Sequence, residues 1–318
     1  MTRVDRGRYG FALPLVLAVA TCALLLVLAS ASTTWRAYRG ARAAMAHARA
    51  DLAAERGVAL LVRDALDDSL RERPLADTLR SSEVDAEGLT LSRVVVRASP
   101  FTMWVVVTAS EGGGGDLAAV RATRIRAERL AAPSWPVRAA VVSTSSIDSS
   151  GAMLTGTLMD DRTDCFAERH AAIAAARQLP VDSVRPAWST SWPAARARAT
   201  PWSVDAPVDA RWRVHIIPEE DSVLLGPRRW QGLVLHDGPL RLVGAFTGRG
   251  LLVVRGTLDA SAARLAISGA VLVDDPRAQP VRLGAATVQW NRCAVSMALA
   301  TVAVPRSAPF HTWVGLTP

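Results

Sequence analysis

A glycine-punctuated repeat in the C-terminal third of the chain carries the clearest structural signal. It reads GLVLHDGPL at residues 232–240 and GLLVVRGTL at residues 250–258, and GAVLV at residues 269–273 begins a third copy. The copies start 18 and 19 residues apart. Short aliphatic strands separated by glycine corners are typical of the stacked coils of a β-solenoid. Glycine suits these corners because it tolerates positive φ and close backbone approach. A β-sandwich with regular hairpins is the alternative.

The region before this repeat also has the composition of β-strands. Residues 89–98 and 101–110 are rich in valine and threonine, and a proline separates them. Residues 117–130 form a third strand or a short helix, and the four glycines at 112–115 form the tip of a hairpin. A phosphate-binding loop is excluded there because the chain has no lysine. We therefore expect a small β-rich meander over residues 74–135.

The exported β-solenoid-like domain is expected over residues 136–318, and residues 139–158 open it as two short strands. It contains an insertion at residues 180–213 that is dense in proline and tryptophan. Prolines at this spacing predict irregular chain without a regular helix or central strand. We expect the tryptophans to fix the insertion onto the domain, and contact with a partner is the alternative. The residues concerned are Pro180, Pro186, Pro193, Pro201, Pro207, Trp188, Trp192, Trp202 and Trp212.

The N-terminal region predicts a long helix that begins in a membrane. No residue from Tyr9 to Trp35 is charged, and the apolar run at residues 11–31 is long enough to cross a hydrocarbon core. Helical spacing of apolar residues continues to residue 73, where Pro74 gives a stop. The expected fold class is therefore α+β, with a transmembrane and amphipathic helix at 11–73 followed by a β-rich domain. A signal peptide cleaved near Ala31 is the alternative.

The segment RYGFALPLVL at residues 8–17 resembles a prepilin leader, in which a short basic peptide ends in glycine and phenylalanine follows. The resemblance implies a leader at residues 1–10, cleaved by a prepilin peptidase between Gly10 and Phe11, with the apolar helix retained. Major pilins carry glutamate at the fifth mature position, which is Leu15 here. This departure favours a minor pilin or a tip pseudopilin over a bulk filament subunit.

The glycine-aliphatic repeats resemble the exported domain of PilX-like pilus assembly proteins. The two resemblances together imply a structural or assembly subunit of a type IV pilus or related secretion filament. They imply a single-pass inner-membrane protein with an exported C-terminal domain, assembled into a surface pilus. The implied partners are other pilin or pseudopilin subunits, inner-membrane assembly proteins, the prepilin peptidase and the lipid bilayer.

The sequence offers little catalytic chemistry, and we predict that the chain is not an enzyme and needs no metal or cofactor. No two histidines have zinc-site spacing. Asp160, Asp161 and Asp164 lack the spacing of a calcium loop and are interpreted as solvated acids. Two alternatives remain open: a membrane-anchored surface protein of the adhesin type, and a solenoid carbohydrate-active enzyme that uses Asp237 or Glu219.

Charge and cysteines add two further expectations. The formal net charge is +8 and all of the positive charge is arginine. The arginines are scattered, which favours a compositional origin over a nucleic-acid partner. Cys22 lies in the apolar run, while an exported location permits a disulfide between Cys165 and Cys293.

Overall fold

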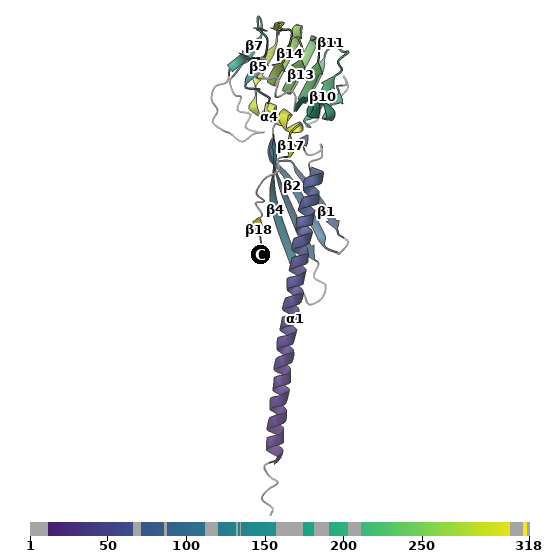
Figure 1. Ribbon diagram of the computed structural model, residues 1–318, viewed down its shortest axis with the longest axis vertical. Helices are drawn as coiled ribbons and strands as arrows, with labels where there is room; N and C mark the ends of the chain where they lie inside the picture. The colour runs from purple at the N-terminus through teal and green to yellow at the C-terminus, as the bar shows by residue number, and fades with distance from the viewer. Residues whose placement is uncertain are drawn as a thin grey trace, which may run out of the picture.

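The computed structural model shows one long helix that carries two β lobes, an antiparallel one beside its C-terminal half and a parallel one at the far end (Figure 1). The α+β fold class is confirmed. The structure describes residues 12–65, 71–85, 88–111, 120–131, 133, 135–156, 174–180, 191–202, 211–305 and 314–316.

Helix α1 spans Ala12–Ala65, and its 54 residues give a length of about 81 Å. Alanine, leucine and arginine dominate it, and all three are strong helix formers. Pro14 lies in the first turn, where its missing amide hydrogen would have no intrahelical partner. The long helix predicted at residues 11–73 is therefore present, and the structure describes it over Ala12–Ala65.

The C-terminal part of α1 packs on an antiparallel sheet of four consecutive strands. The contact is made by small side chains, among them the fully buried Ala50 and Ala54. A Cβ placed on Gly57 would lie 2.9 Å from Val107 Cγ1, so the helix approaches the sheet closely at this glycine. The strands, paired in the order β1-β2-β3-β4, are β1 (Thr78–Val84), β2 (Thr90–Ser99), β3 (Thr102–Glu111) and β4 (Val120–Ala131).

The meander expected at residues 74–135 is present, and β4 settles the open choice at 117–130 in favour of a strand. The far end of the chain also joins this sheet. Strands β17 (Val304–Pro305) and β18 (Val314–Leu316) both pair antiparallel with β4. This corrects the prediction that residues 136–318 all belong to the solenoid domain. They cover the edge of β4, whose backbone groups would otherwise lack sheet partners.

The second lobe is a parallel β-solenoid, and this arrangement excludes the sandwich alternative. Its central strands are β10 (Arg213–Ile217), β12 (Arg228–Asp237), β13 (Leu240–Arg255) and β14 (Leu258–Val273), and each pairs in parallel with the next. The corner glycines of the sequence repeat stack in register, Gly232 opposite Gly250 and Gly250 opposite Gly269. Buried aliphatic residues stack behind them to form the core.

Stacking explains both the glycines and the unequal repeat spacing. A Cβ on Gly250, whose φ is +133°, would lie 2.0 Å from the carbonyl oxygen of Gly232. The register shifts between Arg241 and Val243, which pair with Asp259 and Ala262. This β-bulge absorbs the one extra residue that makes the second repeat 19 residues long instead of 18.

Shorter strands complete the solenoid, and three of them lie where two were expected at residues 139–158. Helix α4 (Arg292–Thr301) follows the last strand of the solenoid, begins at the N-cap Asn291 and packs most of its residues into the solenoid core. The shorter strands are β5 (Ala139–Ser143), β6 (Ile147–Asp148), β7 (Met153–Thr155), β8 (Ala174–Gln178), β9 (Thr200–Pro201), β11 (Val223–Leu225), β15 (Val281–Arg282) and β16 (Thr287–Trp290).

The insertion at residues 180–213 corrects one expectation and confirms another. Residues 191–198 are helical, although proline density had predicted irregular chain. Pro193 lies in the first turn of this helix, where proline is tolerated. The described tryptophans fix the insertion to the solenoid, because Trp192, Trp202 and Trp212 are all buried in its core. Trp188 lies outside the described residues.

Arginine side chains tie the two lobes together. Arg71 and Arg198 each donate from Nη1 to the carbonyl oxygen of Ala303, at 2.8 Å and 3.3 Å. Arg97 donates from Nη1 to the carbonyl oxygen of Arg71 at 2.6 Å. Burial lowers the pKa of Arg97 to about 10, so it remains charged at neutral pH. The end of the solenoid is thus bound to the strands beside α1.

Candidate functional site: the exposed half of helix α1

The N-terminal half of α1 is apolar and exposed along its whole length. The exposed fractions of Leu13, Leu15 and Leu26 are 72%, 65% and 71%. The most apolar window of this helix has 0% of its residues buried, and the helix is long and apolar enough to cross a membrane. A continuous exposed apolar surface of this kind marks a site of contact with lipid or with other proteins. It is the principal candidate site of the described chain.

The few polar side chains in this half bond to the helix that carries them. Ser30 donates to the carbonyl oxygen of Val27 at 2.9 Å, and Thr34 donates to that of Ser30 at 2.8 Å. Thr21, Ser32 and Thr33 make equivalent bonds three or four residues back. Because each of these hydroxyl groups already has a hydrogen-bond acceptor, it can lie in hydrocarbon without an unpaired donor.

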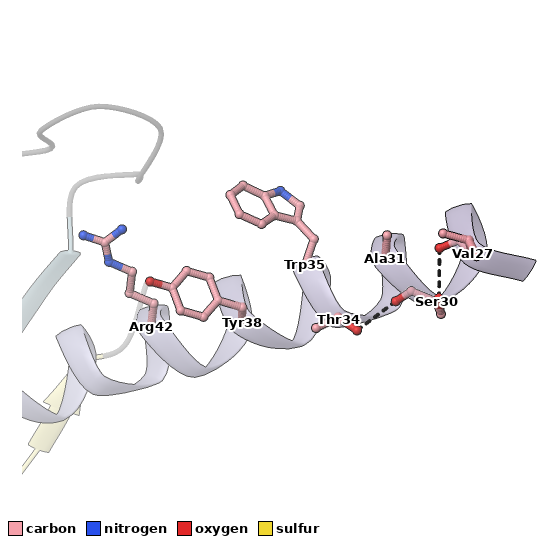
Figure 2. Close-up of a pocket in the computed structure, with 7 residues that line it drawn as sticks. All are labelled: Val27, Ser30, Ala31, Thr34, Trp35, Tyr38 and Arg42. Carbon is pink, nitrogen blue, oxygen red and sulfur yellow. Dashed lines mark hydrogen bonds between the residues drawn. The ribbon is translucent and has the colours of Figure 1, made fainter. Parts of the chain in front are cut away.

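An aromatic and basic cluster lies where the uncharged stretch ends. The rings of Trp35 and Tyr38 are stacked with centroids 6.0 Å apart, and the Arg39 guanidinium lies 5.0 Å from the Trp35 centroid. Figure 2 shows Trp35, Tyr38 and Arg42 along one side of α1. Tryptophan, tyrosine and arginine are typical of the interface between hydrocarbon and water.

Lengths along α1 agree with a membrane span that ends at this cluster. Leu13 to Trp35 covers about 33 Å of helix, compared with about 30 Å for a hydrocarbon core. Ala46 is the first α1 residue to contact the core beside the antiparallel sheet. It lies about 16 Å beyond Trp35 along the axis. Both lobes therefore lie on the same side of the predicted span.

The residues singled out for processing and cross-linking are only partly described. Gly10 and Phe11 lie outside the described residues, as does Cys165. Leu15 belongs to the exposed apolar half. Cys293 is buried in α4 and disulfide-bonded, whereas Cys22 is a free cysteine on the exposed half of α1. The Cys165–Cys293 pairing stays a prediction.

Each of the described carboxylates considered for catalysis is paired with an arginine. Glu219 pairs with Arg196 at 2.8 Å, and Asp237 pairs with Arg255 at 3.3 Å. Asp160, Asp161 and Asp164 lie outside the described residues. Within the part of the chain that the structure describes, no three His, Cys, Asp or Glu side chains gather as a metal site would require.

One side-chain arrangement on the solenoid was not predicted. Arg241, Asp259, Arg282 and Asp148 occupy consecutive positions across four paired strands, so positive and negative charges alternate. The hydroxyl of Ser261 donates to Asp259 and, more than the nearby arginines, holds the pKa of that carboxyl below its usual value. These residues lie far apart in sequence, and only the parallel register brings them together.

No protein-family model, curated protein or solved structure matches the chain.

Proposed function

We propose that the chain is a minor-pilin-like subunit of a type IV pilus or related secretion filament. In this proposal α1 anchors it in the inner membrane, both lobes are exported, and the partners are other pilin or pseudopilin subunits. One observation carries the proposal. A single helix has one half exposed and apolar, while its other half is packed on the antiparallel β lobe.

The continuity of α1 favours assembly into a filament over anchoring alone. Helix α1 runs without a break from its apolar half into its packed half. The apolar half and the lobes are therefore expected to move together. Full burial of a leucine or valine side chain stabilises by about 1.5–3 kcal/mol relative to exposure. If the apolar half of α1 leaves the bilayer, other apolar surfaces must cover it. The apolar helices of neighbouring filament subunits would provide such a cover.

Leu15 is consistent with a subunit present in few copies. It places an apolar side chain, 65% exposed, where major pilins carry glutamate. No carboxylate is then available at that position to pair with a neighbouring subunit. This supports a place at a tip or in an initiation complex over one in the shaft.

The other candidate functions gain less support from the described residues. An adhesin-like surface protein would use the tryptophans of the insertion, but Trp192, Trp202 and Trp212 are buried. A solenoid carbohydrate-active enzyme would use Asp237 or Glu219, and each of these is paired with an arginine. We therefore propose a structural role, without catalysis.

The experiment that tests the proposal is N-terminal sequencing of the mature full-length protein from membranes of cells with and without a prepilin peptidase. We expect a start at Phe11 only when the peptidase is present, and an uncut chain for the variant Gly10→Val. Gly40→Ala serves as a control because a Cβ there would meet nothing within 4 Å. An uncut wild-type chain, or a start just after Ala31, would contradict the proposal and restore the anchored or secreted alternatives.

A further inference from the structure

A shallow hollow runs along α1 from the apolar half into the aromatic and basic cluster. It begins at Val27, passes the small residues Ala31 and Thr34, and ends at Tyr38 and Arg42 (Figure 2). The Trp35 ring, stacked on Tyr38, forms its wall. One end of the hollow is therefore apolar and the other is aromatic and cationic, which is the polarity of a phospholipid molecule.

The charges that α1 itself places around the hollow have one sign. Arg36, Arg39 and Arg42 are all exposed, and residues 12–50 contain no acidic side chain. The first acid along α1 is Asp51, which pairs with Arg124 of β4 at 3.0 Å. The nearest carboxylate on the helix is therefore engaged with the lobe, and the charged side chains that α1 contributes to the cluster are all cationic.

The length of the hollow matches one leaflet of a bilayer. Val27 to Arg42 covers about 22 Å of helix. Half of a 30 Å hydrocarbon core together with its headgroup layer measures about 20–22 Å. A lipid lying along the hollow would thus have its acyl chain beside Val27 when its phosphate reaches the level of the arginines.

We infer that this hollow binds one anionic phospholipid of the leaflet on the exported side, its acyl chain along Val27 and Ala31 and its phosphate against Arg39 and Arg42. The inference rests on α1 spanning the membrane, not on assembly into a filament. The bound lipid would fix how deeply the helix sits and how far the lobes stand from the membrane surface.

The local chemistry supports this occupant. The position of Arg39 over the Trp35 ring orders its guanidinium, which leaves less side-chain freedom to lose when a phosphate binds. The hydroxyls of Ser30 and Thr34 donate to helix carbonyls. These two donors therefore need no hydrogen-bond acceptor from a lipid, and an acyl chain can lie beside them. Guanidinium groups bind phosphate oxygens through paired hydrogen bonds.

Fluorescence quenching by brominated lipids tests the inference. The full-length protein is reconstituted in phosphatidylcholine vesicles with a small fraction of phosphatidylglycerol brominated near the ester end of its chains. The quenching of Trp35 is the quenching in wild type minus that in Trp35→Phe. Enrichment is the Trp35 quenching by brominated phosphatidylglycerol divided by that by the same fraction of brominated phosphatidylcholine. We expect wild type to enrich the anionic lipid, by about fivefold for each contacting arginine.

The variants decide the outcome. Arg39→Ala/Arg42→Ala should return the enrichment to about 1, whereas Arg49→Ala removes the same kind of exposed charge about 10 Å beyond Arg42 and should leave it unchanged. Equal quenching by both lipids in wild type would overturn the inference. A loss of enrichment in Arg49→Ala equal to that in Arg39→Ala/Arg42→Ala would also overturn it, because it would indicate a diffuse charge effect. The absence of any quenching that depends on Trp35 would overturn it too.

Discussion

Substitution of Gly250 by alanine tests the stacking of the solenoid corners. Two costs combine at this position. The backbone has φ of +133°, which a residue with a Cβ adopts at a cost of about 1–3 kcal/mol. The added Cβ would also lie 2.0 Å from the Gly232 carbonyl oxygen, whereas close carbon–oxygen contacts are normally about 3.3–3.6 Å. The two strands must therefore separate by more than about 1 Å at this corner.

Separation of the strands weakens the hydrogen bonds that flank the corner, each with a net contribution of about 0.5–1.5 kcal/mol. With two such bonds lost, Gly250→Ala should cost about 4 kcal/mol in total. A loss of 1 kcal/mol lowers the Tm of a domain of this size by about 2–4 °C, so we expect a decrease of about 8–16 °C.

Gly238→Ala is the matched control because it carries the conformational cost alone. Its φ is +118°, and the nearest atom to an added Cβ is His236 Nε2 at an ordinary 3.7 Å. We expect a cost of about 2 kcal/mol and a Tm decrease of about 4–8 °C. The assay is thermal unfolding of the full-length protein in detergent, followed by the circular dichroism of its β structure. A Gly250→Ala protein that melts no lower than Gly238→Ala would refute the argument from stacked corners.

Three further predictions follow from other parts of the fold. Gly57→Leu should lower the free energy of unfolding by about 1–3 kcal/mol, because its side chain meets Val107 of β3, while Gly40→Leu, where a Cβ meets nothing within 4 Å, should keep the wild-type Tm. Asp259 has a lowered pKa in the folded state, so its stabilising contribution is present above the usual value of 3.8 and is lost as the pH falls through the folded-state pKa. The Tm difference between wild type and Asp259→Asn should therefore shrink below about pH 4, and a difference that grew with acid would contradict it. Mass spectrometry of the unreduced, digested protein should yield a peptide that joins Cys165 to Cys293, and recovery of both as free thiols would rule the pair out.

The sequence alone determined the features that depend on local pattern. The glycine-aliphatic repeat predicted stacked coils, because glycine at a fixed spacing marks the corners and aliphatic runs mark the buried strands. The uncharged run before Arg36 predicted a helix long enough for a membrane. Richness in valine and threonine predicted the strands of the meander. The large apolar area of tryptophan predicted that Trp192, Trp202 and Trp212 of the insertion are buried.

Only the tertiary structure decided the features that depend on pairing between distant segments. Local pattern does not reveal that Val304 and Pro305 return to the edge of β4, because edge strands accept a partner from anywhere in the chain. The alternating charges that include Arg241 and Asp259 exist through parallel register. The helix at residues 191–198 overrides its proline content, because one proline in a first turn costs little and the buried Trp192 fixes it to the core. Contacts such as these close long loops, and their formation depends on the assembled core rather than on neighbouring residues.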